Sequence, residues 1–482
     1  MRIPFAIAIA LTGCPDRSIS EVTPLQNGAV VKKIPVSADI DVLFVIDNSA
    51  STLDKQTVFS ANFPKFVQAL DAFPSGRPNL HIGVIDTTID IGVQGWANGT
   101  AGCPSPDPLD NGLLQNVARV AGCVAPQGQF LADIKNDSGT RTTNYSGTLD
   151  QALSCIALVG ANGCGLESPL EAMKRALDGS KPQNTGFVRT GAYLAVIFLT
   201  DEDDASVKDT SVFALADGAV GGHNDYRVQP LFAYGCDTAI SSSDPGTYKN
   251  CKPRLDSYLQ DPAFYSTFLD SVKDPAQIVV AVIAAPPPGL TTNDHPGMTG
   301  SSPDSVTVGP LTLNGNTQTL ALQPSCMATI NGNPAIGRPA VRLASFLSNF
   351  GSRGRFYSVC QTDYSAALTD IGATLFNAIS PCLEGQVDTT DADPNNPGQQ
   401  LDCVVSDVVN PGTATEMSTP MPACPMSDPT TPAPNGPRPC YWVDMNTTAC
   451  PAPDTGYELK FERTSPPALG TDVDVECSVS GT

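Results

Sequence analysis

Positive charge and histidine are both scarce in this chain of 482 residues. It holds 27 Lys and Arg against 49 Asp and Glu, which gives a formal net charge of −22, and it has three His. A chain with this excess of negative charge repels nucleic acid and anionic membrane surfaces. We therefore expect neither as a partner. The three His are scattered at positions 81, 223 and 295, and no two Cys have the C-x-x-C spacing. The sequence therefore predicts neither a zinc site nor a dithiol redox motif.

Motifs that mark catalysis are also missing. The chain has no G-x-S-x-G, no H-E-x-x-H and no phosphate-binding loop. Each of these motifs supplies a nucleophile, a metal with its base, or a cradle for phosphate. We therefore do not predict an enzyme.

The N-terminus lacks an apolar run long enough to cross a bilayer. The run Ile3–Leu11 follows Met1-Arg2 and is well short of the roughly 20 residues that a spanning helix needs. It matches a secretory signal peptide. The tetrad Leu11-Thr12-Gly13-Cys14 resembles the lipobox of bacterial lipoproteins, which implies cleavage before Cys14 and lipid attachment to it. The alternative is an ordinary signal peptide with an incidental cysteine.

A lipid anchor would place the protein in a bacterial cell envelope. Several acyl chains, at about 0.8 kcal/mol per buried CH₂, hold a protein firmly on a membrane. Pro15 stands where lipoproteins retained at the inner membrane often carry Asp, which favours the outer membrane. The sequence leaves open whether the protein faces the periplasm or the cell surface.

The cysteine count fits an oxidising compartment. Of 15 Cys, lipid on Cys14 would leave an even number, enough for seven disulfides, although the count does not give the connectivity. Five Cys lie in residues 401–482, and five cannot all pair with one another. At least one must bridge to the preceding domain or stay free, and Cys382 is the nearest candidate.

Oxygen-bearing side chains follow two apolar runs. Residues 42–46 end in Asp47, with Ser49 and Ser51 at alternate positions beyond it, and residues 192–199 end in Thr200-Asp201. Continuous apolar runs are typical of strands buried on both faces of a parallel sheet. Such sheets bind ligands beyond the carboxyl ends of their strands. Carboxylates and hydroxyls there form an all-oxygen set that suits a hard cation such as Mg²⁺.

Asp47-x-Ser49-x-Ser51 together with Thr200-Asp201 resembles the metal-ion-dependent adhesion site of von Willebrand factor type A (VWA) domains. The resemblance covers roughly residues 39–382 and is closest to bacterial VWA lipoproteins. It implies that Ser49 and Ser51 contact a cation directly, Mg²⁺ or else Ca²⁺ or Mn²⁺, and that Asp47 and Asp201 act directly or through water. It also implies a protein partner that supplies an acidic residue. In the alternative interpretation, the two serines cap the helix that follows the first strand.

One position departs from the VWA pattern. Such sites usually take a Thr from the loop before the helix that here begins near Ser168, and counting back places Cys164 there. A disulfide at Cys164 would remove it as a ligand. Glu167 is the nearest residue that could take its place as a third carboxylate, and the alternative is a solvated turn residue.

Two other acidic groups are weaker calcium candidates. One comprises Asp201, Asp203 and Asp204, and the other runs from Asp391 through Asp393 and Asn395 to Asp402. Neither has the glycine turn of an EF-hand loop, and two prolines interrupt the second.

The order of apolar runs and helical patterns predicts an α/β protein. We expect a doubly wound, mostly parallel sheet of the VWA type, with strands near residues 80–86, 192–199, 278–284 and 355–359. Apolar positions from Leu53 to Phe73 predict a helix that Pro64 breaks or kinks. Ser168-Pro169-Leu170-Glu171 predicts a helix start with a capping box.

The same patterns divide the chain into segments. They are a signal peptide (1–13), a tether (14–38), the VWA domain (39–382) with insertions near 87–150, 203–276 and 286–336, a linker (383–400) and a Cys-rich, β-rich C-terminal module (401–482).

These observations predict a lipid-anchored envelope protein that binds a protein partner through a divalent cation. The alternative is a structural VWA scaffold, stapled by disulfides, whose site is vestigial or free of metal. An enzymatic function would require chemistry in an insertion or in the C-terminal module that no motif indicates.

Overall fold

A computed structural model gives the fold of most of the chain. It describes residues 29–35, 39–73, 76–90, 111–136, 139–210, 233–240, 244–287, 290, 305–313, 316–383, 386–410, 415–447, 450, 455–465, 467 and 471–479. Cys14 and the expected signal peptide lie outside these residues. None of the helices in the described ranges is long and apolar enough to cross a membrane.

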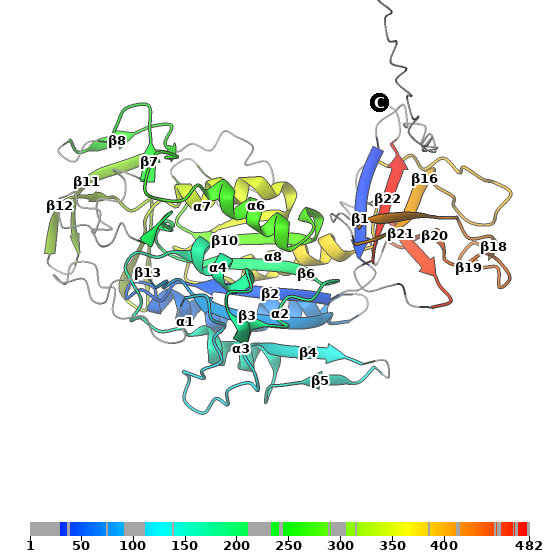
Figure 1. Ribbon diagram of the computed structural model, residues 1–482, viewed down its shortest axis with the longest axis horizontal. Coiled ribbons are helices and arrows are strands. Elements are labelled where there is room, and N and C mark those ends of the chain that lie inside the picture. Colours follow the sequence, from blue (N-terminus) through cyan, green and yellow to red (C-terminus); the bar gives the residue numbers. More distant parts are fainter. Residues whose placement is uncertain are drawn as a thin grey trace, which may run out of the picture.

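A seven-stranded sheet forms the centre of the larger domain (Figure 1). Five of its strands are parallel, and β4 and β5 join one edge antiparallel. In spatial order the strands are β15 (Gly354–Ser358), β10 (Ile278–Ala284), β6 (Tyr193–Leu199), β2 (Asp39–Ile46), β3 (Asn79–Asp86), β4 (Leu131–Lys135) and β5 (Arg141–Thr143).

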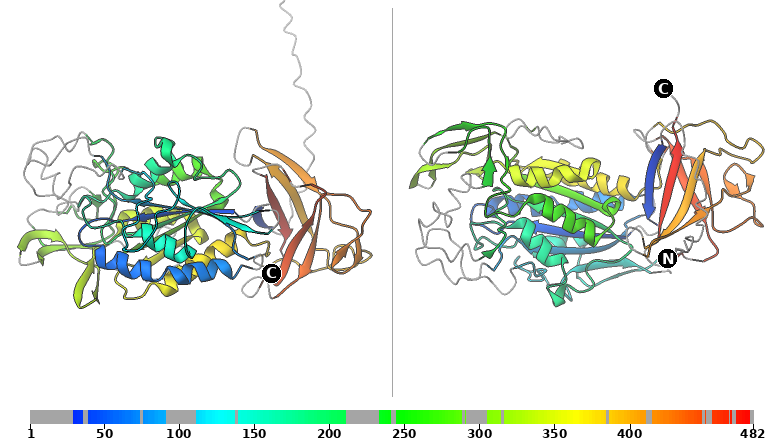
Figure 2. Two further views of the ribbon diagram at one scale, coloured as in Figure 1. Left: turned by 90° about the horizontal axis from the view of Figure 1, so that it is seen from below. Right: turned by 45° about the horizontal axis from the view of Figure 1, so that its top comes forward.

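Helices cover both faces of this sheet (Figure 2). One face packs against α1 (Leu53–Ala61), α2 (Phe63–Asp71), α3 (Leu149–Ala157) and α8 (Ser365–Ile379). The other packs against α4 (Pro169–Leu177), α6 (Pro262–Val272) and α7 (Val341–Leu347). Short 3₁₀ turns lie at η1 (Pro182–Asn184), η4 (Pro275–Gln277) and η5 (Ser348–Arg353).

Strand β2 shows why its sequence is apolar throughout. Phe44 and Ile46 belong to the core on one face, and Leu43 and Val45 to the core on the other. Successive side chains of a strand point to opposite faces, so a central strand with helices on both sides is apolar at every position. This confirms the expected α/β class with a mostly parallel sheet.

When the five parallel strands are numbered afresh from 1 to 5 along the chain, their spatial order from β3 to β15 is 2-1-3-4-5. This is the order of one common doubly wound sheet. The order reverses between β2 and β6, which are hydrogen-bonded neighbours. Helices that follow these two strands lie on opposite faces, and sheets of this kind typically bind ligands beyond the strand ends at such a point. The expected site residues follow β2 and β6.

The predicted helix break is confirmed. Helix α1 ends at Ala61 and α2 begins at Phe63, with Pro64 in the first turn of α2. Proline lacks an N–H and is tolerated in a first turn but not in a helix interior. In α8 the four apolar residues Leu368, Ile371, Leu375 and Ile379 are buried, as their spacing predicts.

Residues 87–150 are more regular than the sequence suggests. They contain β4 and β5, which widen the sheet, and they end where α3 begins, at a capping box made by Thr148 and Gln151. We expected an insertion here and named no strands within it. The strands are short, and β4 is held by pairing with β3, which a local pattern does not reveal.

Small strands decorate the sheet at the ends of β6 and β10 (Figure 1). Those between residues 234 and 322 share a small core around Tyr234, Cys251 and Val306. They are β7 (Tyr234–Gly235), β8 (Gly246–Tyr248), β9 (Lys252–Pro253), β11 (Val306–Leu313), β12 (Asn316–Leu322), β13 (Cys326–Ile330) and β14 (Asn333–Gly337).

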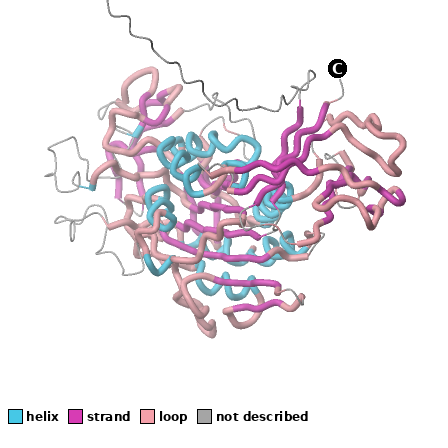
Figure 3. The backbone as a smooth tube through the Cα atoms, turned by 45° about the vertical axis from the view of Figure 1, so that its right-hand side comes forward, coloured by secondary structure: helices cyan, strands magenta, loops and turns pink. Residues whose placement is uncertain are grey.

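A β-rich module lies at the other end of the molecule (Figures 1 and 3). Its main sheet has the order β1-β22-β16-β17. The strands are β1 (Ala29–Pro35), β16 (Cys403–Val409), β17 (Met417–Met421), β18 (Met426–Asp428), β19 (Thr431–Pro432), β20 (Cys440–Met445), β21 (Tyr457–Glu462) and β22 (Thr471–Ser478).

Two segments expected to be extended connections belong to this module. Residues 14–38 were predicted as a tether, yet Ala29–Pro35 forms β1 and pairs with β22 along seven positions. Residues 383–400 were predicted as a linker, yet Leu383 and Val387 are buried in the core of the module. Both predictions rested on local polarity, and in both cases the stabilising partner comes from a distant part of the chain.

All thirteen cysteines in the described part of the chain are disulfide-bonded. Cys382–Cys450 joins the end of the α/β domain to the C-terminal module, as the count of five cysteines suggested. Cys164 is disulfide-bonded too. The other pairs are Cys123–Cys155, Cys236–Cys251, Cys326–Cys360, Cys403–Cys477 and Cys424–Cys440.

Candidate functional site

The candidate site lies where β2 and β6 end, at the edge of the sheet that faces away from the β module (Figure 1). The backbone N–H of Asp47 donates to the carbonyl of Leu199 (2.9 Å), so the ladder between β2 and β6 continues to the first residue of the site. Asp47 and Thr200 therefore lie side by side. A parallel pair of neighbouring strands thus brings together two motifs that are far apart in the sequence.

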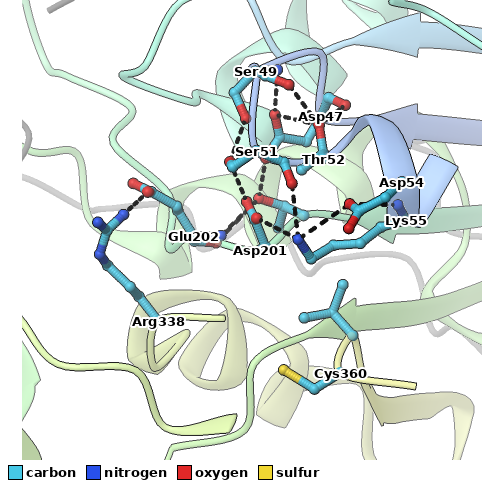
Figure 4. A network of polar contacts seen from close by, with 12 residues as sticks. Asp47, Ser49, Ser51, Thr52, Asp54, Lys55, Asp201, Glu202, Arg338 and Cys360 are labelled. Atoms are coloured by element: carbon cyan, nitrogen blue, oxygen red, sulfur yellow. Dashed lines mark hydrogen bonds and ion pairs between the residues drawn. The ribbon is translucent and has the colours of Figure 1, made fainter. Parts of the chain in front are cut away.

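Three side-chain oxygens form a chain at this edge (Figure 4). The Ser49 and Ser51 hydroxyls are 3.1 Å apart. Ser51 donates to Oδ1 of Asp201, also at 3.1 Å. The N-cap residue of helix α1 is Thr52, and no side chain, including those of the two serines, caps this helix. The two serine side chains turn toward Asp201 instead, so the capping alternative does not describe them.

Asp47 lies beneath these oxygens and is fully buried. One of its carboxylate oxygens accepts from the backbone N–H of Ser49 (2.7 Å), and the other accepts from the Thr200 hydroxyl (2.8 Å). The Thr52 hydroxyl donates to the backbone carbonyl of Asp47 (2.8 Å). These bonds fix the turn that aims Ser49 and Ser51.

The loop before α4 approaches the site through Gly163. A Cβ at Gly163 would lie 2.0 Å from Oδ1 of Asn48, so only glycine fits this contact. The next residue, Cys164, is in a disulfide and has no free thiol. Glu167 is buried in the same loop, where the charges of Asp47 and Asp201 both act on its carboxyl group. Asp47, Ser49, Ser51 and Asp201 thus form one hydrogen-bonded group, and Glu167 is buried in the adjoining loop.

Two cations at the site were not predicted. The Lys55 ammonium lies 2.9 Å from Oδ2 of Asp201, and Arg338 forms an ion pair with Glu202. Both side chains are buried. Lys55 follows Ser51 by four residues, a spacing that places it on the same side of the helix start, so the sequence held a signal for it. Arg338 follows β14, and no local pattern links it to the site.

Like charges and burial raise pKa values at this edge. Burial and then the charge of Asp201 raise the pKa of the Asp47 carboxyl, against the hydrogen bonds from Ser49 and Thr200. Burial, Asp47 and Asp201 raise the pKa of Glu167 well above its ordinary value. Burial, with repulsion between the carboxylates second, thus disfavours their ionised forms, and additional positive charge would stabilise those forms.

The acidic run after β6 is structural beyond Asp201. Asp203 accepts from the backbone N–H groups of Arg342 (2.8 Å) and Leu343 (3.1 Å), and so caps the start of α7. Asp204 accepts from the backbone N–H of Leu170 (3.2 Å) at the start of α4, and it forms an ion pair with the buried guanidinium of Arg342 (3.0 Å). These contacts occupy both carboxylates, so the alternative calcium site at Asp201, Asp203 and Asp204 is wrong.

The predicted capping box at Ser168 does not form, because residues after β6 bind the N–H groups at the start of α4. The Ser168 hydroxyl donates to the carbonyl of Leu166, and Glu171 forms an ion pair with Arg175. Asp204 and the hydroxyl of Ser206 accept the N–H groups at the start of α4. The N–H of Glu171, which a capping box would direct to Ser168, is thus bound by Ser206, and Asp204 adds a carboxylate, which is a favourable acceptor at a helix N-terminus.

The second calcium candidate is a set of local turns. Asp391 accepts from the backbone N–H of Asp393 (3.2 Å), and Asp393 accepts from that of Asn395 (3.2 Å). Asp402 accepts from the Ser478 hydroxyl (2.6 Å). Aspartate side chains that bond to the backbone two residues on are typical of turns. Within the ranges given above, no group of three or more His, Cys, Asp or Glu side chains is arranged to hold a metal.

A cation at the candidate edge would therefore depend on the serine hydroxyls. An octahedral Mg²⁺ has oxygens at about 2.1 Å, which places neighbouring oxygens about 3.0 Å apart. The two separations of 3.1 Å along Ser49, Ser51 and Asp201 fit two edges of such an octahedron. The donor set is all oxygen, as this class of cation prefers.

Comparison with known proteins gives little further information. No protein-family model and no curated protein matches the sequence. Among solved structures, the chain is similar to the pilus adhesin RrgA from Streptococcus pneumoniae, at 11% sequence identity and a TM-score of 0.22. That alignment covers 94% of this chain and 57% of the adhesin. A similarity of this degree carries no argument about fold or function.

Proposed function

We propose that the edge formed by Asp47, Ser49, Ser51, Glu167 and Asp201 binds a divalent cation, Mg²⁺ or else Ca²⁺ or Mn²⁺. We further propose that the α/β domain is of the VWA type and binds a protein partner through that ion. The observation that carries the proposal is the chain of three oxygens, Ser49 Oγ, Ser51 Oγ and Asp201 Oδ1, each 3.1 Å from the next.

The balance of charge at the site supports this proposal. Four buried carboxylates, Asp47, Glu167, Asp201 and Glu202, face two buried cations, Lys55 and Arg338. Burying charge without compensation is costly, and the group then tends to neutralise. One divalent cation would supply the two missing positive charges.

Access from solvent supports a role in partner binding. Ala50 and Ser51 are exposed, whereas Asp47 and Asp201 beneath them are buried. A cation held from below by the protein would keep a position open on the exposed side. An Asp or Glu of a partner protein suits that position, because its carboxylate is the ligand that a hard cation prefers.

The arrangement of the molecule suits a tethered binding protein. Strand β1 lies in the β module, and β2 runs from there across the α/β domain to Asp47 (Figure 1). A membrane anchor at Cys14 would hold the module end and leave the site on the opposite end. Mass spectrometry of the mature chain tests the anchor: lipid on Cys14 supports it, and an unmodified Cys14 or another start contradicts it.

One observation favours the alternative function of a metal-free scaffold. The Lys55 ammonium already neutralises Asp201 at 2.9 Å. If no divalent cation binds, the disulfide-stapled domain would serve as a structural unit whose site is held together by Lys55.

Thermal unfolding separates the two functions. A cation that binds the folded state alone raises Tm by mass action. We expect Mg²⁺, Mn²⁺ or Ca²⁺ at millimolar concentration to raise the Tm of the wild type, but not of Asp47→Ala or Asp201→Ala. Asp428→Asn, which removes an exposed carboxylate in the β module, is the matched control and should keep the shift.

The same two alanine variants, and chelator, should abolish capture of a partner from envelope extract. A wild type without any shift would leave the scaffold as the function.

A further inference from the structure

Lys55 is an unusual residue for the place it occupies. It lies in the first turn of α1, and its side chain is 1% exposed. Its ammonium donates to the carbonyl of Ser51 (2.8 Å) and lies 2.9 Å from Oδ2 of Asp201 (Figure 4). Lysine is almost never buried without a partner, and a positive charge is unfavourable at a helix N-terminus. The closer contact with buried Asp201, and a longer one with the carboxylate of Asp54 (3.6 Å), therefore hold it there.

Asp201 divides its two oxygens between different partners. Oδ1 accepts from the hydroxyl of Ser51, and Oδ2 faces Lys55. The ammonium thus contacts one carboxylate oxygen and leaves the other to the hydroxyl of Ser51. A side chain in this place both orients the carboxylate and neutralises it.

We propose that Lys55 is a built-in counter-cation that sets the concentration at which the cation site fills. This inference rests on the proposed function and deepens it. Without a divalent cation, Lys55 neutralises Asp201 and keeps the site folded. With one, Lys55 remains a second positive charge nearby and weakens binding of the ion.

The effect has a definite direction. Two positive charges a few ångströms apart in a partly buried site repel each other strongly, because the local dielectric is far below that of water. The contact from Lys55 also orients the Asp201 carboxylate, which would strengthen binding, but the net gain from one such contact is smaller than the repulsion between two full positive charges. Repulsion should therefore prevail, so that the site fills where divalent cations are abundant and empties without unfolding where they are scarce.

The test compares cation binding by the full chain with that of Lys55→Met, using Mg²⁺, Mn²⁺ and Ca²⁺ separately in calorimetric titrations. We expect Lys55→Met to bind at least about tenfold more tightly than the wild type. Its Tm without added cation should be lower, because the carboxylates lose their counter-cation. Lys55→Arg keeps the charge and should bind as weakly as the wild type.

A second variant guards against failure of Lys55→Met to fold. Lys55→Gln removes the positive charge but keeps an N–H donor for the carbonyl of Ser51, to which the ammonium donates. We expect Lys55→Gln also to bind the cation at least about tenfold more tightly than the wild type. Equal or weaker binding by a folded Lys55→Gln would overturn the inference.

The outcomes also separate this inference from the proposed function. If the wild type and Lys55→Met bind equally well, the proposed function stands and the role of Lys55 is wrong. If only Lys55→Met binds the cation, Lys55 is the counter-cation, and the proposal that the native site binds a divalent cation is wrong. If no variant and no wild type binds, both proposals fail.

Discussion

At the scale of single residues, Glu167 decides how far this site departs from the VWA pattern. Cys164 is in a disulfide, and Glu167 is the carboxylate of that loop which the charges of Asp47 and Asp201 affect. We expect Glu167→Gln to weaken cation binding by about ten- to a hundredfold, as loss of a ligand or its supporting partner usually does. The protein without cation should keep its Tm, because one repelling charge is lost.

The matched control for this prediction is Glu171→Gln. Glu171 follows Glu167 by four residues, lies in the first turn of α4 and forms an ion pair with Arg175. Calorimetric titration should show unchanged cation binding for this variant. If Glu167→Gln also binds like the wild type, Glu167 is a bystander in the loop.

Asp41 provides a test of pH dependence away from the site. It lies at the start of β2, where its carboxylate accepts from the backbone N–H and the side chain of Arg189. Burial raises its pKa to about 6, although Arg189 acts in the other direction. Because the pKa in the unfolded chain is about 4, the folded state binds more protons between pH 4 and 6. The contribution of Asp41 to stability is therefore complete below pH 4 and decreases as the pH rises to about 6.

Asp41→Asn removes this dependence. A pKa difference of this size corresponds to about 3 kcal/mol. The free energy of unfolding of the wild type, relative to Asp41→Asn, should therefore fall by about 3 kcal/mol between pH 4 and pH 7. Urea unfolding at several pH values measures it, and a difference that stays constant with pH would contradict the assignment.

At the scale of elements, the sequence predicted best what its local pattern determines. The buried strands β2, β6 and β10 appear as continuous apolar runs because helices cover both of their faces. The break before α2 follows from Pro64. Residues at the ends of β2 and β6 could be predicted to lie close together, because parallel strands place their carboxyl ends on the same side of a sheet.

Elements that depend on distant partners could not be predicted in this way. Strand β1 is held by β22, from the opposite end of the chain, and the polar segment after α8 is ordered by burial of Leu383 and Val387. Lys55 was missed because a lysine near an acidic motif is usually exposed, and Arg338 was missed because no local pattern links it to the site. The cap of α4 was misassigned because its acceptor, Asp204, follows β6 and not the preceding loop.

The role of Asp204 in joining elements leads to a stability prediction. Asp204 caps α4 and pairs with the fully buried Arg342, which is also anchored to the carbonyl of Gln260. Replacing Asp204 with Ala would leave a buried guanidinium without its carboxylate, which typically costs 3–5 kcal/mol. We expect a loss of about this size in urea unfolding. Asp256→Asn, which changes an exposed carboxylate, should cost under about 0.5 kcal/mol. Equal losses in both variants would contradict the structural role.

At the scale of the whole molecule, one disulfide joins the two domains and others reinforce elements that already share a hydrophobic core. Cys382–Cys450 ties the α/β domain to the β module, and Cys403–Cys477 ties strands β16 and β22. Each such bond contributes about 2–4 kcal/mol. Thiol counting on the denatured but unreduced mature protein should therefore find essentially no free thiol, and reductant should lower Tm markedly. Several free thiols would contradict the pairing.

The whole-molecule account rests on one claim, that a divalent cation binds beside Ser49, Ser51 and Asp201 at the end of the sheet opposite the β module. The most direct test is anomalous X-ray scattering from crystals of the full chain that are saturated with Mn²⁺. The account predicts a single strong anomalous peak within coordination distance of both serine hydroxyls. Crystals of Asp47→Ala should lack that peak. Well-ordered wild-type density at these residues with no peak between them would contradict the account.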